Sequence, residues 1–273
     1  MPNQSPIPNL QSRFSFQRYL TAKRTVDDRA LHRGVLDTLR ARLPPNPSLL
    51  EIACGTGVMF DRLMDWGQVP SGTRYFGVDA DPQNIAAARQ REPGLPGAVT
   101  PSFLCADVFD LAPPEPPDLL IACAFLDLMD IPRALARLTG FLHPGGLCWF
   151  PINFDGETIF HPAHSLDAEI IPAYHATMRT PQAGRLLFTA LPAAGIEILA
   201  AGASDWVVHP LNGAYPADEA YFLAHILHFF ETSLAGHPAL PEWLSARRAQ
   251  LERRELTFIA HQLDFVGEFA GMR

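Results

Sequence analysis

The stretch LLEIACGTG at residues 49–57 decides the fold of this chain. Its apolar start suits a buried strand, and its end carries two glycines, Gly55 and Gly57. Glycine permits a left-handed backbone and leaves no Cβ between the main chain and a ligand. A helix that starts just after the glycines offers free N–H groups. The stretch therefore predicts a strand, a tight turn and a helix that can together bind a ligand.

Outward from this stretch, short apolar runs alternate with amphipathic segments. Strands are expected over residues 48–53, 74–78, 102–105, 118–124 and 146–152, with helices over residues 58–64, 85–89 and 131–142. Strands that alternate with helices pair in parallel through right-handed crossovers. The pattern predicts a doubly wound α/β sheet, in which ligands bind beyond the carboxyl ends of the strands.

The flanking segments extend this sheet. Apolar residues at helical spacing predict a helix over residues 14–43, which a run of prolines ends. Helices are also expected over residues 165–179, 182–195, 217–235 and 241–254, and strands over 196–208 and 256–265. The helix around residues 220–230 is strongly apolar, so it could pack on a second copy of the chain and form a homodimer.

Composition and charge limit the partners. The chain has 273 residues, of which 48% are hydrophobic, so it can bury a large core. Its net charge of -8 argues against nucleic acid as a partner. Residues 1–14 lack the apolar run of a signal peptide, and no stretch approaches the roughly 20 apolar residues of a membrane helix. A soluble, cytoplasmic protein is expected, with no membrane partner.

Neither the cysteines nor the histidines predict a metal site. The cysteines lie on or beside apolar segments without paired ligand spacing, which predicts buried reduced thiols: Cys54, Cys105, Cys123 and Cys148. His161 and His164 have a spacing that could share a metal, as do His225 and His228. No cysteine or acidic ligand stands beside either pair, so we expect no metal.

Acidic residues follow the second and third predicted strands. Asp79 comes about 20 residues after the glycine turn, where a carboxylate can accept hydrogen bonds from both hydroxyls of a ribose. Asp81 is expected to cap the next helix, with Pro82 at its first position. Asp107 could accept a hydrogen bond from an adenine amino group, or it could be an ordinary turn aspartate.

The sequence LHPGG at residues 142–146 predicts only a turn when it is taken alone. In the order glycine loop, strand-end acid, Ala-Asp-Val and LHPGG, however, residues 48–152 resemble the class I S-adenosylmethionine-dependent methyltransferases. This resemblance implies a Rossmann-like, mostly parallel sheet of seven strands, with helices on both faces and a reversed last strand beside the sixth. It also implies S-adenosylmethionine as the cofactor and S-adenosylhomocysteine as the product.

The resemblance also implies a division of the chain. Residues 48–208 and 256–273 would form the methyltransferase core, residues 1–47 an N-terminal helical lid, and residues 209–255 a helical cap. Matched to the family, the cofactor-binding residues would be Glu51, Ala53, Gly55, Gly57, Asp79, Ala80, Asp107, Val108 and Cys123. Ala53 stands where the family has its first glycine. Arg24, on the first helix, would pair with the cofactor's carboxylate, or its charged helix face would simply be solvated.

Candidates for the methyl-transfer chemistry lie past the fourth and fifth strands. Asp127 follows the fourth strand, and Asn153 and Asp155 lie in a polar run after the fifth. Asn153 could bind the acceptor and Asp155 could act as a base, or the run could be a solvated loop. His175 is a further candidate for the acceptor pocket. Aromatic residues in the cap predict a small, partly apolar acceptor, methylated on oxygen or nitrogen.

Two other functions are compatible with the fold. A nicotinamide-dependent oxidoreductase would need a third glycine where Phe60 stands. A catalytically inactive scaffold or regulatory subunit could still bind S-adenosylmethionine or S-adenosylhomocysteine, because the cofactor motifs are intact.

Overall fold

The computed structural model describes residues 14–68, 70, 72–90, 99 and 101–271. The expectations for residues 1–13, including the lack of a signal peptide, lie outside the described residues.

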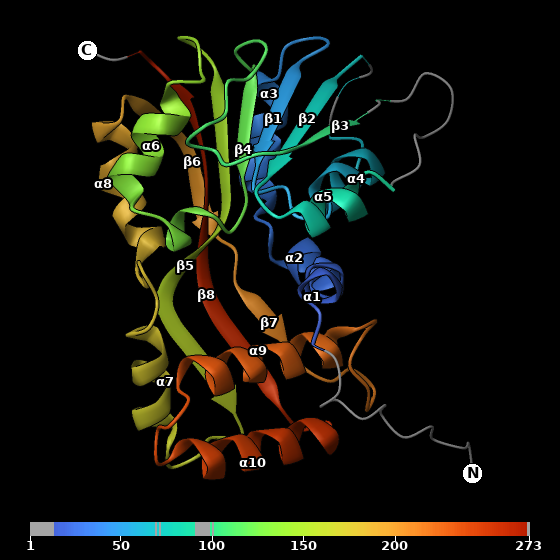
Figure 1. The fold of residues 1–273 in the computed structure, drawn as a ribbon, viewed down its shortest axis with the longest axis vertical. Helices are drawn as coiled ribbons and strands as arrows, with labels where there is room; N and C mark the ends of the chain where they lie inside the picture. Colours follow the sequence, from blue (N-terminus) through green and yellow to red (C-terminus); the bar gives the residue numbers. More distant parts are fainter. Residues whose placement is uncertain (1–13, 69, 71, 91–98, 100, 272–273) are drawn as a thin grey trace.

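One sheet runs through the molecule (Figure 1). Its strands are β1 (Ser48–Ile52), β2 (Arg74–Asp79), β3 (Pro101–Cys105), β4 (Leu119–Ala122), β5 (Leu147–His161), β6 (Ile196–Ala203), β7 (Trp206–Val208) and β8 (Thr257–Phe269). The strand order is β3-β2-β1-β4-β5-β8-β6, and β7 also pairs with β8. Strands β1 to β5 pair in parallel, whereas β8 runs antiparallel to β5 and β6. The predicted doubly wound sheet and its reversed last strand are confirmed.

Helices cover both faces of the upper part of the sheet, because strand residues alternate between the faces. Leu49 packs in the core beneath α3 (Arg33–Arg42) and α4 (Val58–Asp65), while its neighbour Leu50 packs in the core beneath α6 (Ile131–Thr139) and α8 (Ala183–Ala193). On the edge of the sheet, α5 (Pro82–Ala88) packs against β2 and β3.

Strand β5 is much longer than residues 146–152, which the sequence predicted, and it continues to His161. It passes two register shifts and stays paired with β8 as far as the pair His161 and Thr257. The polar run after Ile152, which could have been a loop, is therefore strand. Buried phenylalanines such as Phe154 and Phe160 alternate with its polar residues and give it a core to pack on.

The lower ends of β5 and β8 carry a second helical layer (Figure 1). It consists of α7 (Asp167–His175), α9 (Glu219–Ser233) and α10 (Leu240–Glu252), which share one hydrophobic cluster. The apolar face of α9 is buried within this chain: Phe222, Leu223 and Leu227 are each at most 1% exposed. The sequence had allowed this apolar helix to pack on a second copy of the chain. Its apolar residues are explained by packing within this chain.

The long N-terminal helix predicted over residues 14–43 is three helices. They are α1 (Phe16–Ala22), α2 (Arg24–Ala30) and α3. The break before α3 has a local cause, because Leu31 is extended and His32 Nδ1 accepts a hydrogen bond from the Val35 N–H. The break lets α3 pack on the sheet. Helices α1 and α2 lie between the upper part of the sheet and the lower helices (Figure 1).

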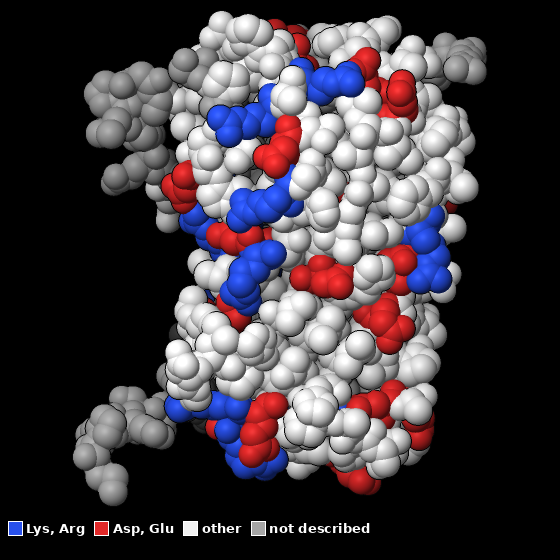
Figure 2. Space-filling model, turned by 180° about the vertical axis from the view of Figure 1, so that it is seen from behind, with Lys and Arg blue, Asp and Glu red and all other residues white. Residues whose placement is uncertain are grey.

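The surface carries mixed charge on the face seen in Figure 2, where Lys and Arg alternate with Asp and Glu. Cys54 and Cys148 are buried as predicted, whereas Cys105 is exposed because it lies at the end of edge strand β3. Within the described ranges, no helix is long and apolar enough to cross a membrane.

Candidate active site

A cavity of about 700 Å³ opens at the carboxyl ends of β1, β2 and β4. Helix α1 covers it with Tyr19, Leu20 and Lys23. Away from the sheet the cavity continues between the lower ends of β5 and β8 and the helices α7 and α9. It therefore joins the strand ends, where ligands bind in this class of sheet, to the helical layer below.

The turn after β1 has the left-handed backbone that its glycines predict. Ala53, Gly55 and Gly57 have φ values of 53°, 54° and 78°. A Cβ on Gly55 would lie 3.0 Å from Leu20 on α1, so the lid and the turn need this glycine to approach closely. Ala53 adopts the same conformation with a Cβ, at a cost of about 1–2 kcal/mol. The turn presents backbone to the cavity without intervening side chains.

Asp79 fixes this turn from the end of β2. Its Oδ2 accepts a hydrogen bond of 2.8 Å from the Gly55 N–H, and its Oδ1 accepts from the Asp81 N–H at 2.8 Å and from Asn84 Nδ2 at 3.2 Å. Asn84 in turn accepts a bond of 3.1 Å from Gln17 on α1. A chain of hydrogen bonds therefore joins α1 to the glycine turn through Asp79, which lines the cavity together with Ala80.

Comparison with known proteins agrees with this geometry. A family model described as a methyltransferase domain matches residues 50–148. A trans-aconitate 2-methyltransferase of Methylobacterium nodulans is 30% identical over 185 residues, which are 64% of this chain and 67% of that protein. The chain belongs to the class I S-adenosylmethionine-dependent methyltransferases. A trans-aconitate 2-methyltransferase of Acidovorax sp. (strain JS42) is 32% identical over 134 residues, or 48% of this chain, and the match spans about half of that relative's length (46%).

Solved structures show the same fold. A SAM-dependent methyltransferase of Thiobacillus denitrificans, in complex with S-adenosyl-L-homocysteine, superposes with a TM-score of 0.51 at 18% identity, covering 95% of this chain and 99% of its own. A SAM-dependent methyltransferase of Geobacter sulfurreducens in the same complex gives a TM-score of 0.51 at 16% identity, covering 97% and 99%.

The structure places the predicted cofactor residues of this methyltransferase in two groups. Those that line the cavity are Glu51, Ala53, Gly55, Asp79, Ala80 and Cys123. Glu51 is 2% exposed and accepts a hydrogen bond from the Tyr75 hydroxyl, which fixes its carboxylate. Outside the lining, Gly57 precedes α4, Val108 packs in the core, and Asp107 Oδ1 accepts a bond of 2.8 Å from the Phe109 N–H, as a turn aspartate does.

Lys23 lines the cavity, whereas Arg24 does not. Arg24 lies beside the acids of α4 and pairs with Asp61 and Asp65. Lys23 Nζ lies 3.6 Å from Asp27 Oδ2. Burial acts to lower the pKa of Lys23, but Asp27, Tyr19 and Cys123 together outweigh this effect and raise it, so the ammonium stays charged. The cation that the structure brings to the cavity is thus the neighbour of the predicted one.

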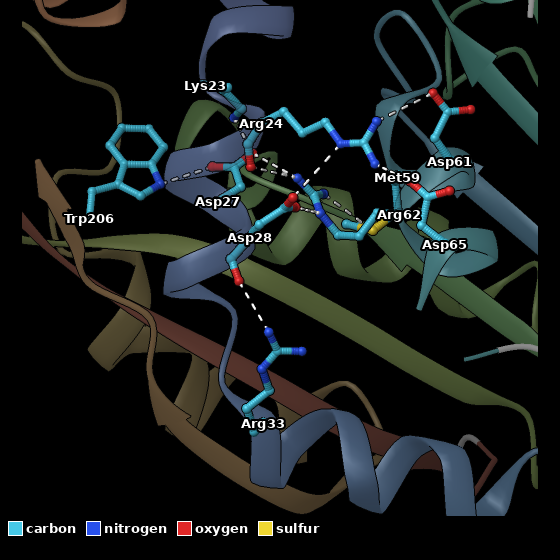
Figure 3. Close-up of polar contacts among 10 residues, drawn as sticks. All are labelled: Lys23, Arg24, Asp27, Asp28, Arg33, Met59, Asp61, Arg62, Asp65 and Trp206. Atoms are coloured by element: carbon cyan, nitrogen blue, oxygen red, sulfur yellow. Dashed lines mark hydrogen bonds and ion pairs between the residues drawn. The ribbon is translucent and has the colours of Figure 1, made fainter. Parts of the chain in front are cut away.

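A buried ionic network holds α2 against α4 (Figure 3). Arg62 on α4 is 2% exposed and donates a hydrogen bond of 2.5 Å to Asp28 while lying 3.6 Å from Asp27. The indole of Trp206 also donates to Asp27, at 2.9 Å. Because α4 follows the glycine turn, the network also ties α2 to the segment that carries this turn.

Asp127 follows β4 and lines the cavity. Burial raises the pKa of its carboxyl to about 6, although its own N–H, Lys23 and the Leu128 N–H act to lower it. The Oδ1 atom of Asp127 is buried and has no hydrogen-bond partner among the residues described. A carboxylate with one buried, unpartnered oxygen and a pKa near neutrality has the properties of a general base.

The other predicted catalytic residues lie outside the cavity lining. Asn153 is fully buried and donates from Nδ2 to the carbonyls of Phe150 and Leu263. Asp155 accepts hydrogen bonds from Arg185 on α8, where the carboxylate forms an ion pair at 2.9 Å. Both side chains lie on β5, whose continued pairing with β8 the sequence did not reveal. The polar run was therefore interpreted as a possible pocket mouth.

His175 does not line the cavity itself, but it contacts a residue that does. Its Nε2 lies 3.0 Å from the hydroxyl of Thr158, which does line the cavity. Burial lowers the pKa of His175, so the ring is neutral at pH 7. This histidine can therefore orient the Thr158 hydroxyl but carries no charge to the site.

Sequence reasoning missed several lining residues, including Thr158, Asn84 and Gln262. They come from β5, α5 and β8, and none stands in a motif. Asn84 alone had a usable signal, because it lies in the first turn of the helix that Asp81 caps, close in sequence to the strand-end acid.

Proposed function

We propose that the cavity binds S-adenosylmethionine at the strand ends and a small-molecule acceptor below it, and that the chain methylates that acceptor. The supporting observation is Asp127, whose unpartnered Oδ1 lies in a cavity that the glycine turn, Asp79 and the helical layer all line. The names of relatives specify methyl transfer to trans-aconitate and to a dTDP-linked amino sugar, and both are small molecules.

The residues present fit the cofactor. Gly55 offers an open backbone, and Asp79 and Glu51 offer carboxylates at the ends of β2 and β1. Asp79 would hold the ribose, and Lys23 would pair with the methionine carboxylate in place of Arg24. The N-terminal residues up to residue 47, which include α1 and α2, would act as a lid, and residues 209–255 would act as a cap. When bound, S-adenosylmethionine supplies an electrophilic methyl group on a sulfonium.

The chain's own residues would activate and orient the acceptor. Asp127 Oδ1 would accept the proton of the acceptor's O–H or N–H, so that the acceptor becomes a better nucleophile. The lid helix and the aromatic side chains of the helical layer would exclude water and orient the acceptor. Glu51 and Asp79 would act as binding groups.

A labelled-methyl assay tests this proposal. Wild-type protein would be incubated with methyl-labelled S-adenosylmethionine and a library of small alcohols, phenols and amines, and labelled product would be measured. Asp127→Asn should lose transfer while it still binds S-adenosylhomocysteine, and Asp110→Asn, at an exposed site, is the matched control. Equal transfer by Asp127→Asn and wild type would remove Asp127 from the base role.

A further inference from the structure

The lower half of the cavity is lined by aromatic side chains. Phe154 comes from β5, Tyr174 from α7, Phe229 and Phe230 from α9, and Phe258 from β8. The rings of Tyr174 and Phe230 stack with their centroids 3.8 Å apart. Flat, apolar walls of this kind favour a flat, apolar ligand, which they can contact without a change of structure.

The cavity holds little free positive charge. Its lining cations are Lys23, Arg62 and Arg179. Lys23 and Arg62 both lie 3.6 Å from Asp27, and Arg62 also pairs with Asp28. Arg179 is exposed to solvent. Lys23 and Arg62 are therefore already paired with carboxylates of α2, and the proposed function assigns Lys23 to the cofactor, so neither is left for an anionic acceptor.

Two buried polar atoms of the lining have no hydrogen-bond partner among the described residues: Asp127 Oδ1 and Gln262 Oε1. Gln262 is 2% exposed on β8, at the other wall of the cavity. Leaving such atoms buried without partners is costly, so a ligand is expected to supply the donors. An ionised carboxylate only accepts hydrogen bonds, and an amide brings no charge, so neither group can neutralise an anion.

We infer that the acceptor is an uncharged, mainly apolar and flat small molecule, which presents its O–H or N–H to Asp127 and a second polar group to Gln262. This inference rests on the proposed function of the cavity. It separates this chain from relatives whose names specify trans-aconitate, because a polycarboxylate would place several negative charges beside Asp127 without free buried cations.

Calorimetric titration of the full chain, saturated with S-adenosylhomocysteine, tests the inference with three probes. 2-Naphthol is neutral and has one hydroxyl, 2-naphthoate has the same ring system with a carboxylate, and trans-aconitate is a polycarboxylate. We expect 2-naphthol to bind at least about tenfold more tightly than either anion, since a like charge next to Asp127 is unfavourable.

Two variants test which residues of the cavity discriminate between the probes. Asp127→Asn keeps the volume of the side chain and removes its charge, so it should strengthen 2-naphthoate binding about tenfold, whereas Asp37→Asn on the exposed face of α3 should not. Ala260→Phe adds a ring inside the cavity and should abolish 2-naphthol binding while S-adenosylhomocysteine still binds.

The outcomes separate this inference from the proposed function. Failure of S-adenosylhomocysteine to bind would overturn both. If it binds, the inference alone is overturned by three results: an anionic probe that binds as tightly as 2-naphthol, a lack of 2-naphthol binding, or full 2-naphthol binding in an Ala260→Phe variant that retains S-adenosylhomocysteine.

Discussion

The Gly55 N–H donates a hydrogen bond of 2.8 Å to Asp79 Oδ2, so the glycine turn after β1 is held by the acid that ends the neighbouring strand. The two sequence motifs of the cofactor site are thus one structural unit. The other oxygen of Asp79 accepts from Asp81 and Asn84, and Asn84 is bonded to Gln17 on the lid. A ligand at the strand ends would meet a carboxylate that is already fixed in place.

Asp79→Ala should weaken binding of S-adenosylhomocysteine by about 10- to 100-fold, because it removes charge-assisted hydrogen bonds and frees the glycine turn. Calorimetric titration measures this. Asp130→Ala is the matched control, since Asp130 caps α6 through a 3.0 Å bond to the Arg133 N–H and lies outside the cavity lining. It should lose about 1 kcal/mol of stability and no affinity. Equal affinity of Asp79→Ala and wild type would contradict the ribose role.

Lys23→Met should weaken binding of S-adenosylhomocysteine about tenfold or more, because a charge-assisted bond to the methionine carboxylate is lost. Adenosine lacks the amino-acid part, so its affinity should stay the same. Arg24→Met, which faces α4, should change neither affinity. A loss confined to Arg24→Met would restore the assignment that the sequence favoured.

Asp127 should give the methyl-transfer rate a pH dependence. Burial raises the pKa of its carboxyl to about 6, and only the ionised form accepts a proton. The rate should therefore rise with pH up to about 6 and level off above it, and Asp127→Asn should lower it by about 100-fold or more. A rate profile that keeps its limb near pH 6 in Asp127→Asn would assign the titration to another group.

The same carboxyl should reduce stability at neutral pH. Its pKa is higher in the folded chain than the ordinary value of 3.8, so the folded state binds more protons between about pH 4 and 6. The free energy of unfolding should fall as the pH rises through this window. Asp127→Asn should then be more stable than wild type at pH 7, by on the order of 2–3 kcal/mol, and equal to it near pH 3. Urea unfolding at both pH values checks the sign.

Arg62 and Asp27 should prove coupled. Removing the buried guanidinium in Arg62→Leu leaves Asp27 with less compensation and should cost about 3–5 kcal/mol of stability. The double variant Arg62→Leu, Asp27→Asn should cost less than the sum of the single variants, as a double-mutant cycle from chemical unfolding would show. Strictly additive costs would mean that the contact between α2 and α4 is not energetically coupled.

The sequence predicted the upper part of the sheet well, because its signals are local. Strands such as 74–78 and 102–105 are short apolar runs bounded by turns, and the structure has them at Arg74–Asp79 and Pro101–Cys105. The last strand also followed from its alternating pattern, whereas its reversed direction was implied by the resemblance to the methyltransferase family. These features depend on hydrophobic periodicity and turn residues, which a single sequence carries.

The half of the cavity that lies below the strand ends could not be predicted in the same way. The extension of β5 depends on pairing with β8, which is about 100 residues away, and this pairing turns Asn153 and Asp155 into buried strand residues with partners outside the cavity. The choice between Lys23 and Arg24 depends on tertiary packing, because Arg24 pairs with acids of α4 whereas Lys23 lines the cavity. Ala53, in contrast, could be predicted from the motif. The family has a glycine at this position, and Ala53 has the left-handed backbone that a glycine favours.

The most direct test of cofactor binding is a thermal-shift titration with S-adenosylmethionine, S-adenosylhomocysteine and NAD side by side. A ligand that binds only the folded state raises its stability as the ligand concentration exceeds the dissociation constant. The account predicts a saturable rise in Tm with both sulfur nucleosides and none with NAD. A rise with NAD alone, or no rise with any of the three, would contradict it.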